Sequence, residues 1–125
     1  EGQVFDSYKF VSDIIRNAEK SIVLIDNYID DSVLLLLNKR KKEVPVTIFT
    51  KVVSEQLALD LKKYNQQYPF IEIKEFKQSH DRFLILDNKC VYHFGASLKD
   101  LGKKWFAFSK FDKEAFILLE RLGLK

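Results

Sequence analysis

His80 and Arg82 lie two positions apart, immediately before an apolar run at residues 83–86. On an extended strand, residues two apart point to the same face, so these two side chains share one side and Asp81 lies on the other. A histidine beside a cation suits the binding of one phosphate group and nucleophilic attack on it. The spacing fits equally well with a turn histidine followed by an edge-strand arginine.

The residues after the apolar run predict a β-hairpin. Asn88 and Lys89 are expected to form a two-residue turn, and residues 90–94 read as the returning strand. This hairpin would bring Ser97 beside Arg82. The small residues Gly95 and Ala96 just before it would let the backbone approach a phosphate closely, and Ser97 would add a hydroxyl.

The predicted hairpin register also places the second histidine of the chain. It pairs Leu86 with Val91 and Leu84 with His93, so that His93 would face the same side as Arg82. Because His93 lies in the middle of a strand, we interpret it as a core or supporting residue rather than as a second catalytic histidine.

The motif resembles the signature of the phospholipase D superfamily, which reads His, any residue, Lys, four residues, Asp, then a Gly-Ser element and a later Asn. His80, Arg82 and Asp87 have the matching spacing, and Ser97 stands near the Gly-Ser position. The whole chain also resembles a module at the C-terminal end of bacterial, phage-related DNA-binding regulators. The match is close over the motif, and the remaining sequence fits one half of the superfamily fold.

The chain departs from that signature at three positions. Arg82 replaces the lysine, Ala96 separates Gly95 from Ser97, and Asp100 replaces the asparagine. Arginine keeps the charge and can bind two phosphate oxygens, so phosphate binding is expected to persist. The broader guanidinium would displace the phosphorus, and a shift of about 1 Å can lower a rate by roughly a hundredfold.

The resemblance implies a phospholipase D-like half, an α/β fold whose mixed, mostly parallel sheet has helices on both faces. It implies a metal-independent phosphodiesterase that forms a phosphohistidine and acts on nucleic acid. No cofactor and no metal are implied. With a single motif, a complete site would need a homodimer. The expected catalytic residues are His80, Arg82, Ser97 and Asp87, and the expected substrate-binding residues are Lys51, Lys99, Lys103 and Lys104.

The sequence is therefore consistent with two hypotheses about function. In the first, the chain is a homodimeric phosphodiesterase or nuclease. In the second, Arg82 and Asp100 mark a catalytically weakened domain that binds DNA or dimerises within a regulator. A metal site made by His80, Asp81 and Asp87 is a distant third, because strand parity separates the histidine from both carboxylates.

Helical and strand patterns alternate along the chain and predict a largely parallel sheet with right-handed crossovers. We expect helices near residues 4–18, 30–37, 54–65 and 112–122, and strands at 21–26, 44–50, 70–76 and the motif hairpin. Asp30 or Asp31 can cap the second of these helices, and Ser54 can cap the third. Ligands in such sheets bind beyond the carboxyl ends of the strands. Those ends are residues 26–28, 50–51 and 77–79, and the last leads directly into His80.

Composition fits one domain spanning residues 1–125, because 46% apolar residues can build a core and no Pro/Gly/Ser-rich linker interrupts the chain. The apolar run at 33–37 is too short to span a membrane, and we expect a soluble, cytoplasmic protein. The first residue is Glu1, so we expect a piece of a longer chain. Cys90 is the single cysteine, and the basic run at 39–42 is expected to form a solvated helix end.

Overall fold

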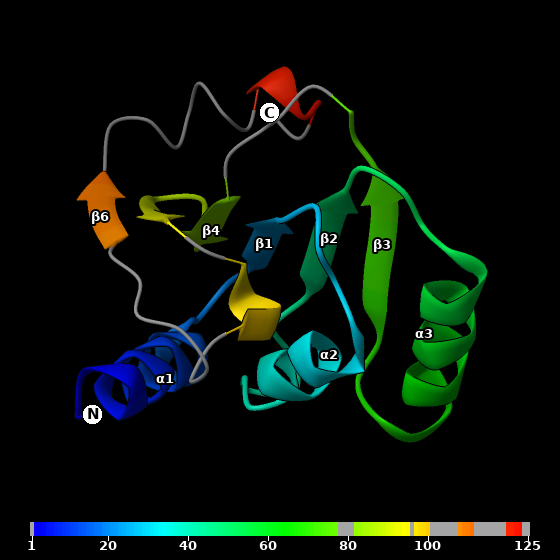
Figure 1. The fold of residues 1–125 in the computed structure, drawn as a ribbon, viewed down its shortest axis with the longest axis horizontal. Coiled ribbons are helices and arrows are strands. Elements are labelled where there is room, and N and C mark those ends of the chain that lie inside the picture. Colours follow the sequence, from blue (N-terminus) through cyan, green and yellow to red (C-terminus); the bar gives the residue numbers. More distant parts are fainter. Residues whose placement is uncertain (1, 78–81, 96, 101–107, 112–119, 124–125) are drawn as a thin grey trace.

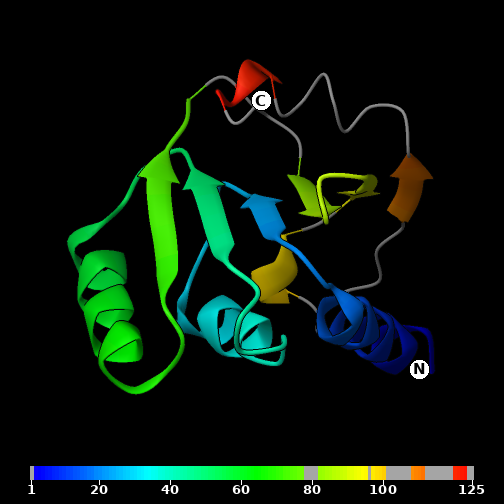
Figure 2. The ribbon, with the colours of Figure 1, turned by 180° about the vertical axis from the view of Figure 1, so that it is seen from behind.

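The computed structural model describes residues 2–77, 82–95, 97–100, 108–111 and 120–123. They form a mixed β-sheet flanked by helices (Figures 1 and 2). None of the helices in this part of the chain combines the length and hydrophobicity that a membrane span requires. In chain order the elements are α1 (Gly2–Asn17), β1 (Ile22–Ile25), α2 (Asp31–Leu37), β2 (Val46–Thr50), α3 (Glu55–Gln67), β3 (Ile71–Glu75), β4 (Arg82–Leu86), β5 (Cys90–Phe94), the 3-10 helix η1 (Leu98–Asp100) and β6 (Phe108–Phe111).

The sheet has the strand order β3-β2-β1-β4-β5-β6. Strands β1, β2 and β3 pair in parallel, and β4, β5 and β6 add antiparallel pairings beside β1. The α/β class and the mixed sheet are confirmed. The described strands make two parallel and three antiparallel pairings, so the parallel share is smaller than expected. One of the antiparallel pairings comes from β6, a strand that was not among those predicted from the sequence.

Alternate residues of β1 supply two clusters of core residues on opposite faces of the sheet. Ile22 and Leu24 join the larger cluster, to which α1, α2 and α3 contribute on one side of the sheet (Figure 1). Val23 and Ile25 join the smaller cluster on the other face, against which Leu122 packs. Leu122 belongs to the predicted helix at 112–122, of which residues 112–119 lie outside the described part. All four β1 residues are buried, as expected of a central strand in an α/β sheet.

The sequence signals for helix starts are confirmed at α2 and α3. Asp30 caps α2 by accepting a hydrogen bond from the Ser32 amide, and Ser54 caps α3 by accepting one from the Leu57 amide. Side-chain oxygens at these positions satisfy amides that have no partner within the helix. The two helices start within one residue of the predicted positions, which sets the direction in which each chain segment returns to the sheet.

The hairpin between β4 and β5 differs from the predicted register by one residue. Leu86 pairs with Cys90 rather than with Val91, and Asp87 and Asn88 have φ angles of 60° and 54°. Positive φ at both central residues gives a turn whose twist suits a hairpin, here without glycine. The turn therefore comprises Asp87, Asn88 and Lys89, and the Lys89 amide donates to the Leu86 carbonyl oxygen at 3.0 Å. The shift moves every later β5 side chain to the opposite face.

Arg40, within the basic run after α2, is buried rather than solvated. Its side chain is 5% exposed, and its guanidinium donates to the Tyr64 hydroxyl and to four carbonyl oxygens, those of Leu37, Val44, Pro69 and Phe70. The expectation of a fully solvated helix end was therefore wrong at this position. Lys41 and Lys42 are exposed, as expected. Arg40 joins the end of α2 to the segment between α3 and β3.

Candidate functional site at the carboxyl edge of the sheet

Polar residues from three adjacent strands meet at the carboxyl edge, on the face that α1, α2 and α3 cover. Thr50 ends β2, Asp26 directly follows β1, and Arg82 begins β4. The register pairs Ile25 with Phe49 and with Phe83, so Asp26 lies between Thr50 and Arg82. The predicted convergence of strand ends beside the start of the motif strand is thus present at Arg82.

Asp26 is the most buried acid of this edge, with an exposed fraction of 0%. The Ser97 hydroxyl lies 2.9 and 2.8 Å from its two carboxylate oxygens, and also 2.8 Å from the Tyr28 carbonyl oxygen. The amides of Tyr28 and Leu98 donate to the same carboxylate at 3.0 and 2.9 Å. Asp26 therefore fixes the chain that leaves β1 and the start of η1 at one point.

Burial raises the pKa of the Asp26 carboxyl, because a charged carboxylate is disfavoured where water is excluded. The amides of Leu98 and Tyr28, the Ser97 hydroxyl and the Arg82 charge act in the opposite direction without reversing the shift. Perturbed carboxyls of this kind concentrate at functional sites, although structural networks also produce them. Sequence reasoning identified residues 26–28 as a strand end but did not include Asp26 among the site residues. An acid directly after four apolar strand residues was the available signal.

Arg82 is half-buried, and its Nε atom is buried without a hydrogen-bond partner among the described residues. Its charge acts on the neighbouring Asp26 carboxyl. Buried donors are normally paired, so an unpartnered guanidinium nitrogen at a strand-end edge fits a side chain that takes part in binding an anion such as phosphate. His80 and Asp81 lie outside the described residues.

Ser97 is 4% exposed, and its hydroxyl is engaged with Asp26 and the Tyr28 carbonyl oxygen. The predicted hairpin does bring it to the edge that carries Arg82. Its contacts, however, are those of a residue that holds η1 in place. Its oxygen also accepts weakly from the Lys99 amide at 3.4 Å.

The predicted basic residues are only partly within the described chain. Lys51 follows β2 at the carboxyl edge and is exposed. Lys99 lies on η1 and its ammonium is 3.3 Å from the Asp100 carboxylate. The negative charge at Asp100 is thus next to a cation. Lys103 and Lys104 lie outside the described residues.

Asp87 lies at the other end of β4 from Arg82. Its carboxylate accepts hydrogen bonds from the amides of Glu19, Lys20 and Ser21, at 2.9, 2.7 and 3.2 Å. Partial burial acts to raise the pKa of this carboxyl, but the three amides and the Lys20 charge outweigh it, so the pKa is lowered. These contacts join the hairpin turn to the segment that enters β1.

His93 lies on the face opposite to Arg82, which corrects the predicted parity. It pairs with Phe83, and the two rings are 5.0 Å apart between centroids. The one-residue shift in the hairpin is the cause, because Arg82 pairs with Phe94 instead of Gly95. His93 is therefore on the wrong face to act with Arg82, and its ring contact fits the predicted supporting role.

No three side chains among His, Cys, Asp and Glu come together as metal ligands within the part of the chain that the structure describes. The described groups that meet beside Arg82 at the carboxyl edge include its guanidinium, the buried Asp26 carboxyl and the hydroxyls of Thr50 and Ser97. Of these, Arg82 offers a donor that can bind a phosphate oxygen, and Asp26 supports the surrounding backbone.

Neither a protein family model nor a curated protein sequence matches the chain. Solved structures do match it. NucT from Helicobacter pylori aligns with a TM-score of 0.67 and 15% identity, over 98% of this chain and 87% of that one. Nuc from Salmonella typhimurium, a phospholipase D family member, aligns with a TM-score of 0.66 and 16% identity, over 92% and 83% of the two chains.

A third structure is TrmBL2, an archaeal chromatin protein described as showing a novel mode of DNA binding. It aligns with a TM-score of 0.59 and 15% identity, over 97% of this chain but 48% of its own. At such identities, the likeness concerns the fold. The mixed sheet, the helices before β1, β2 and β3, and the match to a phospholipase D family member together show that this chain has the phospholipase D-like fold.

Proposed function

We propose that the chain is a nucleic-acid phosphodiesterase whose carboxyl edge binds the phosphate backbone. The observation that carries this proposal is the Arg82 guanidinium, which begins β4 at that edge and has a buried, unpartnered Nε among the described residues. A fixed guanidinium fork matches the oxygens of a phosphate diester. The fold likeness to NucT and Nuc supports the proposal.

In the proposed reaction, a ring nitrogen of His80 attacks phosphorus while the bond from phosphorus to the leaving oxygen breaks. The product of this step is a phosphohistidine. A second imidazole donates a proton to the leaving oxygen and then accepts one from water, whose oxygen attacks phosphorus and breaks the phosphorus–nitrogen bond. Arg82 binds the non-bridging oxygens throughout, and no metal is needed for these steps.

The second imidazole is proposed to be His80 of another copy of the chain, related by a twofold axis. His93 is the other histidine of the sequence. It lies on the far face of the sheet and contacts Phe83. A homodimer is therefore part of the proposal.

Cleavage of fluorescent single-stranded DNA by the purified protein in excess EDTA tests this function. His80→Ala is expected to abolish cleavage, and His93→Ala serves as the matched control, because it removes a histidine from the opposite face. Retained cleavage by His93→Ala together with its loss in His80→Ala supports the proposal. Equal rates for wild type and His80→Ala would overturn it.

The second candidate function is a DNA-binding or dimerisation module without turnover. Arg82 in place of lysine and the fold likeness to TrmBL2 favour it. Under this reading, the wild type binds single-stranded or duplex DNA without cleaving it, and His80→Ala binds as tightly as wild type. EDTA-resistant turnover that depends on His80 would reject it.

A further inference from the structure

A cavity of about 350 Å³ lies where α1, α2 and η1 meet. We call it the Tyr8 cavity. Tyr8 comes from α1, and Leu98 and Lys99 come from η1, immediately after Ser97. The volume is within the range of small-ligand sites. Its remaining lining residues, on or just after α2, are Ser32, Leu35, Leu36 and Lys39.

Among the residues that the structure describes, the charged ones lining the Tyr8 cavity are Lys39 and Lys99. Two acids of the adjoining segments are engaged in other contacts. Asp100 is 3.3 Å from the Lys99 ammonium, and Asp30 accepts hydrogen bonds from the Ser32 amide and hydroxyl at the start of α2. Lys99 is paired with Asp100, so Lys39 is the main positive charge that the described lining residues offer to an anionic ligand.

The other walls of the cavity are apolar or aromatic. The Tyr8 side chain is 39% exposed, and the Lys39 ammonium lies 5.9 Å from the centre of its ring. Leu36 and Leu98 are buried, whereas Leu35 is half exposed. A flat aromatic face beside a cation suits a nucleotide, because the base can stack on the ring while the phosphate meets the ammonium.

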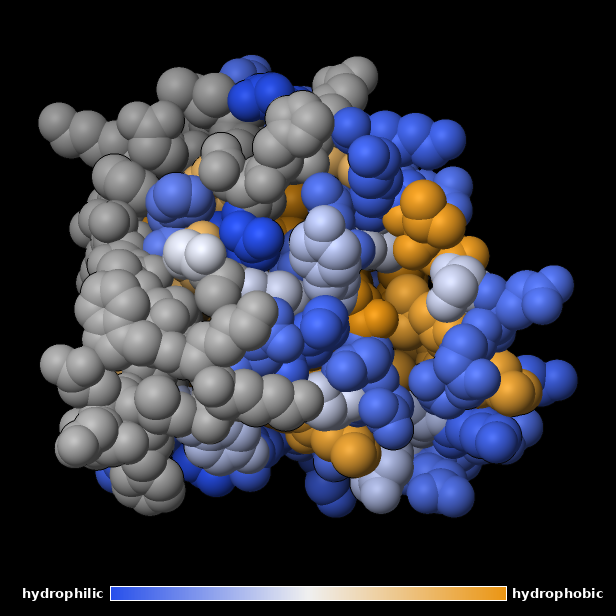
Figure 3. Space-filling view, in the orientation of Figure 1, coloured by the Kyte–Doolittle hydropathy of each residue, from blue (hydrophilic) through white to orange (hydrophobic). Residues whose placement is uncertain are grey.

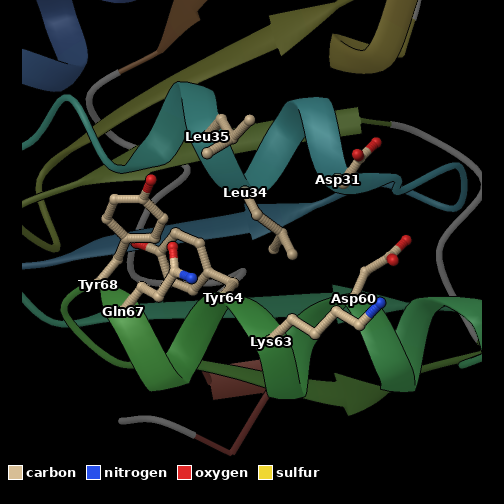
Figure 4. A pocket seen from close by; sticks show the side chains of 8 residues that line it. All are labelled: Asp31, Leu34, Leu35, Asp60, Lys63, Tyr64, Gln67 and Tyr68. Carbon is tan, nitrogen blue, oxygen red and sulfur yellow. The ribbon is translucent and has the colours of Figure 1, made fainter.

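A second cavity, of about 200 Å³ between α2 and α3, provides a contrast (Figure 4). It also offers tyrosines, Tyr64 and Tyr68, but Asp31 and Asp60 outnumber Lys63 among its charged residues. Hydrophobic residues gather over this region of the surface (Figure 3). Its charge disfavours a phosphate. Among the described lining residues, a ring and a cation occur together without an acid in the Tyr8 cavity but not in this second cavity.

We infer that the Tyr8 cavity binds one nucleotide of a single-stranded nucleic acid whose backbone continues past Arg82. This inference rests on the proposed function and adds the strandedness of the substrate. The link between the two sites is η1. Its first amide, that of Leu98, is held by Asp26 beside Arg82, while Leu98 and Lys99 line the cavity.

The expected ligand is single-stranded because a base inside a duplex presents no free face to a tyrosine. Stacking tolerates any base, so little sequence preference is expected. Lys51 follows β2 at the same sheet edge, two strands away from Arg82 on β4, and would contact the backbone there.

Fluorescence anisotropy with a labelled oligothymidylate, and with the same strand in a duplex, tests the inference. Tyr8→Ala is expected to weaken single-strand binding about tenfold, and Tyr8→Phe to leave it unchanged, because the ring is retained. Tyr68→Ala is the matched control, since Tyr68 is also 39% exposed but lines the acidic cavity. Lys39→Gln is compared with Lys42→Gln, which removes an exposed charge outside the cavity.

Weaker single-strand binding by Tyr8→Ala and Lys39→Gln, with both controls unchanged, supports the inference. Unchanged binding by Tyr8→Ala, or the same loss in Tyr68→Ala, would overturn it. Circular dichroism of each variant shows whether it folds, and thymidine monophosphate titrated into the wild type, followed by the Tyr8 NMR signals, tests the cavity without any variant. Failure of the proposed function has a different signature, namely no dependence of cleavage or binding on His80 or Arg82.

Discussion

Asp26 and Ser97 are hydrogen-bonded to each other although 71 positions separate them in the chain. The bond joins the end of β1 to the segment that follows β5, and the Leu98 amide strengthens the same junction. It is a buried, fully engaged contact next to Arg82.

Asp26→Asn is expected to change stability in a pH-dependent manner. Burial raises the pKa of the Asp26 carboxyl above its ordinary value of 3.8, so the folded protein retains this proton at pH values where the unfolded chain has lost it. The wild type therefore loses free energy of unfolding as the pH rises from 3.8 through the raised pKa, and the variant lacks this loss. Urea titrations over this pH range are expected to show that the free energy of unfolding of the variant rises relative to that of the wild type as the pH increases. A pH-independent difference would contradict the prediction.

Asp87→Asn is expected to behave in the opposite way. The pKa of Asp87 is lowered, so its carboxylate contributes stability above pH 3.8 that is lost as the pH falls through the lowered pKa. At neutral pH the variant should lose about 1 kcal/mol, since an amide accepts the three backbone hydrogen bonds less well than a carboxylate does. This difference in free energy of unfolding between variant and wild type should disappear as the pH is lowered. Glu43→Gln, at an exposed position, is the control and should show no such change.

Arg82→Ala is expected to weaken binding of single-stranded DNA and to make the plot of log K against log salt shallower by about 0.7, the value for one lost phosphate contact. Arg82→Lys keeps the charge and should retain the slope. Anisotropy titrations over a salt series measure both. Lys89→Ala, in the turn at the far end of β4, is the matched control, and an equal effect there would indicate non-specific attraction.

Arg40→Met is expected to lower the free energy of unfolding by about 3 kcal/mol, because five acceptors lose their donor in a buried place. Lys42→Gln in the same basic run should be nearly neutral. Urea denaturation of the two variants gives the comparison. A loss below about 0.5 kcal/mol for Arg40→Met would show that water replaces the guanidinium without penalty.

Much of the fold could be predicted from local patterns. The apolar run at β1 and the caps Asp30 and Ser54 predicted their elements within about one to two residues, because burial and capping act on neighbouring positions. The hairpin register could not be predicted, because Asp87 and Asn88 adopt positive φ angles and neither is a glycine that would indicate such a turn. Strand β6 was missed because a four-residue edge strand has too short a pattern.

The site was predictable only in part, for a similar reason. Strand parity and spacing brought Arg82 and Ser97 to one edge. The burial of Arg40 and the engagement of Asp26 depend on partners far away in the chain, which no local pattern specifies. A cationic run usually remains in solvent, so the tertiary partners of Arg40 overrode the local expectation.

The length of β4 sets the spacing of the motif. Arg82 begins this strand and Asp87 follows its last residue, about 17 Å away at the usual strand rise. The first faces the carboxyl edge, and the second holds the backbone before β1. The four residues between them therefore span the sheet along the strand direction, from its carboxyl edge to its opposite edge. Deleting one of these four residues would turn the side chains on one side of the deletion to the opposite face of the sheet. Either Arg82 or Asp87 would then lose its position, so the spacing is required for folding as well as for chemistry.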